Sequence, residues 1–164
     1  VMTAEVLTGY RPASRWRLEV TDRPDGVTVV NDAYNANPES VAAALRTLVA
    51  MSGPDRRSWA VLGPLAELGE ATTQAHREAG ALAVRLGVDR LVVVGEQARS
   101  MCAPVPRSVL VPDVAAALGL LHAQLAPGDV VLVKASRAAG LERIAAGLLE
   151  APDLHNGPGE RGCT

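Results

Sequence analysis

Two short polar segments of the sequence hold the side chains that could do chemistry. The first, residues 31–38, reads Asn-Asp-Ala-Tyr-Asn-Ala-Asn-Pro and lies between a β-rich run and a predicted helix. Its amides can pair with a base edge or a peptide group, and its carboxylate can accept hydrogen bonds from ribose hydroxyls. Asn and Asp also favour turns and helix caps. A turn-and-cap interpretation therefore stands beside a binding interpretation.

The second segment, residues 134–140, reads Lys-Ala-Ser-Arg-Ala-Ala-Gly and directly follows the apolar run 130–133. A lysine, a hydroxyl and an arginine at the end of a strand can hold a phosphate or a carboxylate. The alternative is a solvated loop whose charges only keep the surface wet. Lys134 is the only lysine among 16 basic residues, and three of the four asparagines fall within 31–37. In so biased a composition, these rare residue types favour a chemical role for both segments.

The elements that must position these segments follow an alternating pattern. Two β-rich runs, 16–20 and 27–30, are separated by Asp, Pro and Gly, which predicts an antiparallel hairpin. Strands then alternate with helices, as is typical of βαβ units. We therefore predict a Rossmann-like α/β fold with a mainly parallel sheet, helices on both faces and an antiparallel N-terminal strand. The other predicted elements are strands at 58–62, 91–94, 108–111 and 130–133, and helices from Pro38 (capped by Asn37), over 71–86, from an Asp113 cap to 125, and over 141–149.

The predicted loops that follow strands of this sheet are 31–37, 63–69, 95–100 and 134–140. Ligands of open parallel sheets bind outside the carboxyl ends of the strands, so these loops are where we expect a site. Glu67, in the second loop, is a candidate polar contact, with a solvated carboxylate as the alternative. His76, on a predicted helix, is more typical of a packed or surface residue than of a catalyst.

Composition and charge exclude several classes of protein. Sixteen basic and 18 acidic residues give a formal net charge of −2, without the concentrated basic footprint that binds nucleic acid or membrane surfaces. No apolar run is long enough to span a bilayer, and the first residues lack the pattern of a signal peptide. Cys102 and Cys163 have no spacing typical of a zinc site or a disulfide framework. We expect a soluble cytoplasmic domain with no metal site and no nucleic-acid or membrane partner.

The two common nucleotide-binding motifs do not indicate that this domain hydrolyses ATP by itself. Residues 157–162 match the spacing GxGxxG, but no predicted strand precedes them and no helix follows, so the match is a product of composition. No GxxxxGK motif followed by Ser or Thr occurs in the 164 residues. A domain without such a phosphate loop is not expected to hydrolyse ATP by itself.

A longer pattern around the first segment resembles a known family. Residues 32–40 resemble the D-S-Y-N-A-N-P-x-S signature of the UDP-N-acetylmuramoyl-tripeptide:D-alanyl-D-alanine ligases, within the Mur ligase family. The resemblance covers about residues 15–149 and implies the third, C-terminal domain of such a ligase. On this basis 1–12 is the end of a preceding domain or a linker, 13–150 is the domain, and 151–164 is a flexible tail. The resemblance continues in order at 60–63, 67–69, His76, Glu78 with Gly80, 92–95 and 128–137.

The resemblance implies an ATP-dependent amide-bond ligase of peptidoglycan synthesis. In this family a central domain binds ATP and Mg²⁺ and transfers the γ-phosphate to a carboxylate of UDP-MurNAc-tripeptide, which the amine of D-Ala-D-Ala then attacks. The C-terminal domain closes over the nucleotide and helps to hold the dipeptide, so it supplies positioning and excludes water rather than a catalytic group. Its partners in cis are the N-terminal and central domains, and the isolated domain is expected to be inactive.

The resemblance also implies roles for single residues near the nucleotide. Asp32 matches an acid near the ATP ribose, and Asn35 and Asn37 match asparagines beside the adenine. Arg17 matches an arginine that approaches the phosphates, with Arg15 as the alternative because the local spacing is ambiguous.

Other matched residues face the second substrate. Lys134 and Ser136 match a K-x-S loop facing the incoming amino component, with Arg137 beside it, and Glu67 is assigned to the same substrate. The sequence departs from the family pattern at two places. Residues 63–65 read Gly-Pro-Leu where an acid is usual at the second position, and Ala33 replaces the usual Ser.

Two other functions remain as alternatives. One is a stand-alone nucleotide- or peptide-binding module without catalysis. The other is the equivalent domain of a folylpolyglutamate synthase-like ligase, which the residues Tyr-Asn-Ala-Asn-Pro at 34–38 disfavour.

Overall fold

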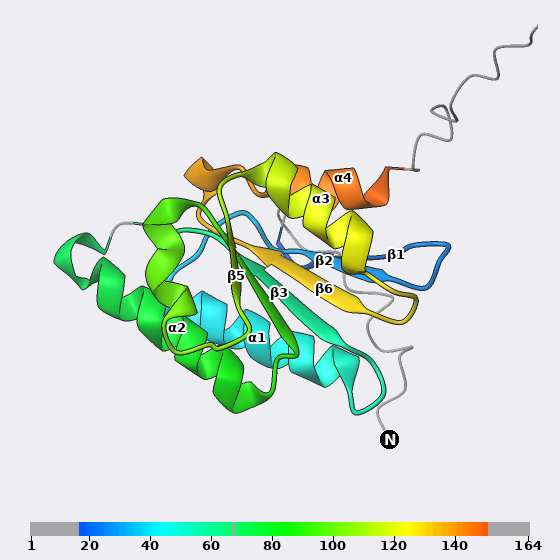
Figure 1. Cartoon of the computed structure of the whole chain (residues 1–164), viewed down its shortest axis with the longest axis horizontal. Helices are drawn as coiled ribbons and strands as arrows, with labels where there is room; N and C mark the ends of the chain where they lie inside the picture. The colour runs from blue at the N-terminus through cyan, green and yellow to red at the C-terminus, as the bar shows by residue number, and fades with distance from the viewer. Residues whose placement is uncertain (1–16, 67, 151–164) are drawn as a thin grey trace, which may run out of the picture.

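The computed structural model describes residues 17–66 and 68–150 of the chain. In this part of the chain the strands form a six-stranded sheet in the order β1-β2-β6-β3-β4-β5 (Figure 1). β1 pairs antiparallel with β2, and every other neighbouring pair is parallel, as predicted. The strands are β1 (Glu19–Asp22), β2 (Thr28–Asn31), β3 (Ser58–Leu62), β4 (Arg90–Val94), β5 (Val109–Val111) and β6 (Val130–Lys134).

Helices cover both faces of the sheet, which confirms the predicted fold class. Two of them, α1 and α2, lie on one face, and α3 and α4 lie on the other (Figure 1). Short 3₁₀ helices occupy three of the loops. The helical elements are α1 (Pro38–Ser52), η2 (Gly69–Ala71), α2 (Thr72–Leu86), η3 (Glu96–Cys102), α3 (Val114–Gln124), η4 (Arg137–Ala139) and α4 (Glu142–Leu149).

The central strands are apolar on both sides because both faces are covered. Along β6, Leu132 packs into the core beneath α1 and α2, while Val131 and Val133 pack into the core beneath α3 and α4. Successive side chains of a strand alternate between faces, so one uninterrupted apolar run serves both cores. Lys134, the last residue of β6, ends this run at the carboxyl edge of the sheet.

Both predicted helix caps are present. The backbone N–H of Ser40 donates to Asn37 Oδ1 (2.8 Å), and the Asn37 N–H donates to Ser40 Oγ (3.0 Å), with Pro38 in the first turn. The N–H of Ala116 donates to Asp113 Oδ1 at the start of α3 (2.8 Å). These contacts fix where residues 31–37 pass into α1, because they satisfy N–H groups that the helix leaves unpaired.

Some predicted boundaries were wrong. The predicted loop 95–100 lies almost wholly in η3, whose Ala98 and Met101 are buried against α2. The first strand runs over 19–22 rather than 16–20, and the second predicted helix begins at Thr72 after η2. The segments 1–12 and 151–164 lie outside the described residues. No helix in the part of the chain that the structure describes is long and apolar enough to cross a membrane.

Candidate functional site

The two polar segments meet at the carboxyl edge of the sheet because their strands are neighbours. β2 pairs with β6 in parallel, with Asn31 opposite Val133, so loop 31–37 and loop 134–140 leave the sheet side by side. The N–H of Asp32 donates to the carbonyl of Val133 (2.9 Å). On the other side of β6, the N–H of Ser136 donates to the carbonyl of Pro64 (3.0 Å), which brings in the loop after β3. We call loops 31–37 and 134–140 together the polar edge.

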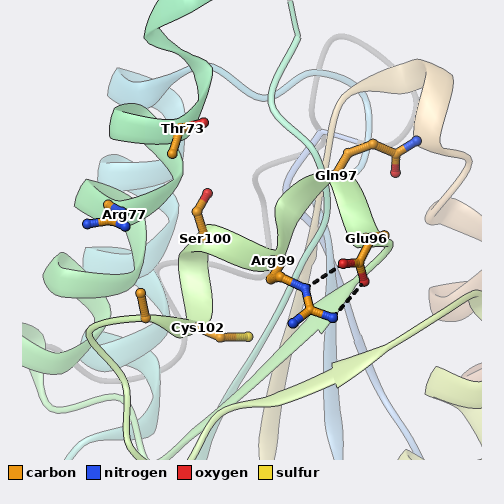
Figure 2. Close-up of a pocket in the computed structure, with 8 residues that line it drawn as sticks. Thr73, Arg77, Glu96, Gln97, Arg99, Ser100 and Cys102 are labelled. Carbon is orange, nitrogen blue, oxygen red and sulfur yellow. Dashed lines mark hydrogen bonds and ion pairs between the residues drawn. The ribbon is translucent and has the colours of Figure 1, made fainter.

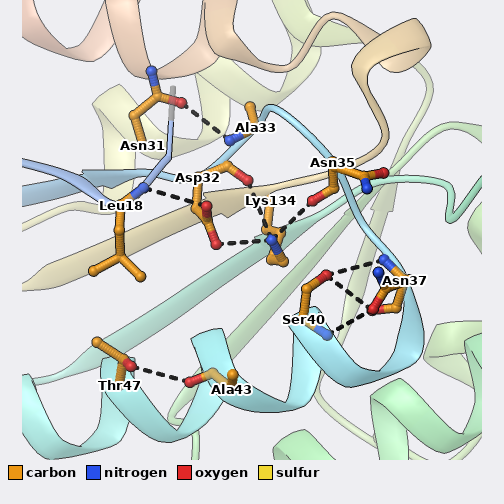
Figure 3. A network of polar contacts seen from close by, with 10 residues as sticks. All are labelled: Leu18, Asn31, Asp32, Ala33, Asn35, Asn37, Ser40, Ala43, Thr47 and Lys134. Carbon is orange, nitrogen blue, oxygen red and sulfur yellow. Dashed lines mark hydrogen bonds and ion pairs between the residues drawn. The ribbon is translucent and has the colours of Figure 1, made fainter. Parts of the chain in front are cut away.

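A buried ion pair joins the two loops. Lys134 Nζ lies 2.7 Å from Asp32 Oδ2, and the lysine side chain is 2% exposed (Figure 3). The same ammonium donates to the carbonyl of Asn35 (2.9 Å) and lies 3.5 Å from the carbonyl of Asp32. Lys134 is therefore not one of the solvated charges of a surface loop. Sequence reasoning had singled out both charged residues but not their pairing.

The other oxygen of Asp32 reaches back to the first strand. Asp32 Oδ1 accepts a hydrogen bond from the backbone N–H of Leu18 (3.2 Å). Leu18 has φ of 48°, in the left-handed region that residues with a Cβ rarely adopt. Asp32 therefore connects Lys134 to the backbone that enters β1, next to Arg17.

Two arginines flank an aromatic ring on the same edge. The guanidinium carbon of Arg17 lies 4.4 Å from the centre of the Tyr34 ring, and that of Arg137 lies 5.7 Å from it. Both arginines are exposed, and neither guanidinium has a hydrogen bond or ion pair with another residue of the described ranges. Stacking on a ring leaves the N–H donors of a guanidinium available for an anion. The structure thus brings a residue from each predicted group, Arg17 and Arg137, to one tyrosine.

The two remaining asparagines differ in their contacts. Asn37 is exposed and acts as the cap of α1, as the turn-and-cap interpretation predicted. Asn35 is exposed, and its backbone carbonyl accepts a hydrogen bond from Lys134 Nζ. Glu67 and Arg15 lie outside the described residues. No group of three or more His, Cys, Asp or Glu side chains that could hold a metal ion occurs among residues 17–66 and 68–150.

A cavity of about 520 Å³ opens beside loop 134–140. Ser136, which is buried, lines this cavity together with Arg143 of α4 and Gln97 of η3. Thr72 at the start of α2 and Asp113, the cap of α3, also line it. Arg143 and Gln97 were not predicted, since no local pattern distinguishes them from surface residues.

His76 lines the same cavity but serves the structure. Its ring is fully buried, and Nε2 accepts a hydrogen bond from the backbone N–H of Leu65 (3.0 Å). Burial lowers the pKa of His76, so the ring is neutral near pH 7. An accepting Nε2 in a neutral ring assigns the proton to Nδ1. His76 therefore fixes the loop after β3, and of the two roles that its position on a helix predicted, packed or surface, it has the packed one.

A second groove lies between α2 and η3 (Figure 2). Arg77 of α2 lines it, as do Arg99 and Glu96 of η3. Arg99 and Glu96 form an exposed ion pair with each other. None of the predicted site residues that the structure describes lines this groove.

The fold and the polar edge together define an α/β domain of the Rossmann type, with polar groups at the carboxyl ends of parallel strands. Residues 16–137 match the family model "Mur ligase, glutamate ligase domain". The chain belongs to the Mur ligase family, and the match confirms the resemblance seen in the sequence.

Relatives with named activities fall in one group. The chain is 49% identical to the UDP-N-acetylmuramoyl-tripeptide–D-alanyl-D-alanine ligase of Mycobacterium tuberculosis H37Rv, over 89% of this chain and 33% of that protein. It is 32% identical to the ligase of the same name from Bacillus subtilis, over 91% of this chain and 34% of the relative. The chain thus spans about a third of the length of the curated relatives it matches.

Solved structures agree with this grouping. The MurF ligase from Thermotoga maritima, in complex with ADP, superposes with a TM-score of 0.70 and 30% identity, covering 82% of this chain and 30% of that one. MurF from Acinetobacter baumannii gives a TM-score of 0.75 and 26% identity, covering 85% of this chain and 31% of that one.

Proposed function

We propose that this chain is the C-terminal domain of an ATP-dependent ligase that adds D-Ala-D-Ala to UDP-MurNAc-tripeptide. The observation that carries the proposal is the polar edge, where groups suited to a nucleotide and groups suited to a carboxylate meet on neighbouring strands. The names of the relatives support the reaction and its substrates. The domain supplies binding groups and closure, while chemistry requires the rest of the protein.

On the nucleotide side, we assign Arg17, Asp32, Asn35 and Asn37 to ATP. The Arg17 guanidinium has N–H donors available for phosphate oxygens, and the amides of Asn35 and Asn37 are exposed. The ADP named with the Thermotoga maritima relative supports nucleotide binding by the full protein. ATP supplies a phosphoryl group that makes the substrate carboxylate reactive toward an amine. Mg²⁺ is assigned to the central domain, as the family resemblance implies.

On the dipeptide side, we assign Ser136 and Arg137, with Glu67 as a further contact. Ser136 lines the cavity of about 520 Å³, as do Arg143 and Asp113. The hydroxyl of Ser136 and the positive charge of Arg143 suit the carboxylate of D-Ala-D-Ala. Lys134 belongs to the same loop, but its ammonium is turned toward Asp32.

The alternatives make different predictions. A folylpolyglutamate synthase/dihydrofolate synthase from Yersinia pestis superposes with a TM-score of 0.55 at 21% identity, which shows a shared fold only. Such an enzyme would use glutamate rather than D-Ala-D-Ala. A stand-alone module would bind a nucleotide or a peptide without turnover.

The test is ligation by the full-length protein that contains this chain. With ATP, Mg²⁺ and UDP-MurNAc-tripeptide, we expect product with D-Ala-D-Ala and none with L-glutamate, and no ATP turnover by the 164-residue chain alone. Product with glutamate instead, or ATP hydrolysis by the isolated chain, would contradict the proposal. Binding of a nucleotide or peptide to a full-length protein that forms no product would favour the stand-alone module.

A further inference from the structure

We propose that Lys134 is a positioning residue, which holds Asp32 and loop 31–37 in one conformation, and that it is not a ligand of the dipeptide. The assignment of loop 31–37 to ATP rests on the proposed function. The contacts of the Lys134 ammonium are a property of this chain and can be tested without any activity.

The first argument concerns the donors of Lys134. An ammonium carries three N–H donors and no acceptor. Here they face Asp32 Oδ2 (2.7 Å), the Asn35 carbonyl (2.9 Å) and the Asp32 carbonyl (3.5 Å), and the side chain is 2% exposed. To reach a substrate, Nζ would have to leave Asp32 as an unpaired carboxylate in a buried place, which is costly. The ammonium is therefore committed within the domain.

The second argument concerns what these contacts hold. Lys134 donates to Asp32 and to the backbone carbonyl of Asn35 (Figure 3). These two residues precede and follow Tyr34 in the chain, so the contacts fix the backbone that carries the tyrosine ring. The ring in turn lies beside the guanidiniums of Arg17 and Arg137. A buried contact between residues 102 positions apart thus determines where two exposed arginines sit.

The third argument follows Asp32 to the first strand. With Oδ2 on Lys134, Asp32 keeps Oδ1 for the N–H of Leu18, whose backbone is left-handed. A left-handed non-glycine residue persists where its surroundings hold it. Lys134 fixes Asp32, Asp32 holds Leu18, and Leu18 adjoins Arg17. The nucleotide-facing groups are preorganised by one ammonium.

Amine labelling tests the contact directly, because Lys134 is the only lysine of the chain. In the folded 164-residue chain we expect acetylation of Lys134 to be roughly 100-fold slower than in the urea-unfolded chain, as a committed, buried amine requires. The Asp32→Asn variant cannot offer one oxygen to Leu18 and another to Lys134. In this variant we expect acetylation of Lys134 to be roughly tenfold faster than in the folded wild type. Asp25→Asn, on an exposed turn, is the matched control and should leave the rate unchanged. A folded wild type that labels as fast as the unfolded chain would overturn the proposal, and this comparison does not depend on whether a variant folds.

Kinetics of the full-length ligase test the role. Lys134→Met should raise KM for ATP roughly tenfold and leave KM for D-Ala-D-Ala within about twofold of the wild type. Adding Asp32→Asn to Lys134→Met should raise KM for ATP little further, because both changes break the same interaction. Ser136→Ala, in the same loop, should raise KM for the dipeptide instead. A rise in KM for the dipeptide with unchanged KM for ATP in Lys134→Met would overturn the proposal. If the full-length protein does not ligate D-Ala-D-Ala, the proposed function fails, while the labelling result still decides whether Asp32 holds Lys134.

Discussion

Tyr34 shows how much of this site depends on single side chains. Its ring sits beside two exposed guanidiniums, Arg17 and Arg137, which have no other partner among the residues that the structure describes. Two guanidiniums repel each other, but the π-electrons of the Tyr34 ring attract each of them. Tyr34 therefore gathers positive charge at the place where a phosphate or carboxylate is expected.

Substitution of Tyr34 should test this arrangement. In the full-length ligase, Tyr34→Leu removes the ring and should raise KM for ATP roughly fivefold, since each cation–π contact at an exposed site contributes about 0.5–1 kcal/mol. Tyr34→Phe keeps the ring and should stay within about twofold of the wild type. Steady-state kinetics with ATP varied would decide. Equal effects of both substitutions would show that the hydroxyl, and not the ring, matters.

At the same scale, sequence reasoning identified residues but not their pairs. Asp32 and Lys134 stood out as a carboxylate in a polar loop and as the only lysine. Their contact could not be predicted, because it depends on β2 lying next to β6, two strands far apart in the sequence. His76 was predicted to be a packed or surface residue rather than a catalyst, and its bond to the Leu65 N–H was not foreseen.

Among the elements, those with local signals were predicted and those made by packing were not. The start of α1 was predictable because Asn37, Pro38 and Ser40 form a cap by contacts between near neighbours. η3 was wrongly predicted as a loop. Its helical turns are stabilised by burial of Ala98 and Met101 against α2, and this packing leaves no local signal in the sequence. A 3₁₀ helix has no periodic apolar pattern of its own to reveal it.

The contact between α2 and η3 gives a stability prediction. A Cβ on Gly80 would stand 2.0 Å from the backbone carbonyl oxygen of Met101, which cannot move without displacing η3. Gly80→Ala should therefore lower the free energy of unfolding by about 2–3 kcal/mol. Gly119→Ala in α3 is the matched control, since a Cβ there meets nothing within 4 Å, and it should be neutral or slightly stabilising. Urea unfolding of both variants checks this, and equal stabilities would contradict it.

Asp129 lies just before β6, at the amino ends of the parallel strands and therefore away from the polar edge. It gives a pH-dependent prediction. Burial by itself would raise its pKa, but hydrogen bonds from Arg57, the Ala126 N–H and Trp59 Nε1 outweigh burial and place the pKa below the ordinary value of 3.8. A carboxyl with a lowered folded-state pKa contributes stability above its unfolded pKa of about 4, and this stability is lost as the pH falls toward the folded pKa.

Asp129→Asn should therefore lower the free energy of unfolding at pH 7 by about 2 kcal/mol. It should also flatten the loss of stability between about pH 4 and pH 2 relative to the wild type. Urea unfolding at a series of pH values measures both, with the exposed Asp25→Asn as control. Wild-type and Asp129→Asn curves that stay parallel below pH 4 would argue against a lowered pKa of Asp129.

For the whole molecule, the alternation of strands and helices was enough to predict the α/β fold, while the site at the carboxyl ends of its strands stays a prediction. The order of the strands was beyond sequence reasoning, because it is decided by which parallel pairs bury the most apolar surface. At the polar edge Lys134 is held within the domain by Asp32, while the nearby guanidiniums of Arg17 and Arg137 are exposed. This arrangement suits a domain that completes a site whose other groups lie elsewhere.

A crystal structure of the full-length protein with an ATP analogue, UDP-MurNAc-tripeptide and D-Ala-D-Ala tests that claim most directly. We predict the polar edge against the nucleotide, with Asp32 or Asn35 within hydrogen-bonding distance, about 3 Å, of its ribose or base, and Ser136 on the side of the dipeptide. A structure with all three ligands bound and the polar edge facing solvent would contradict the account.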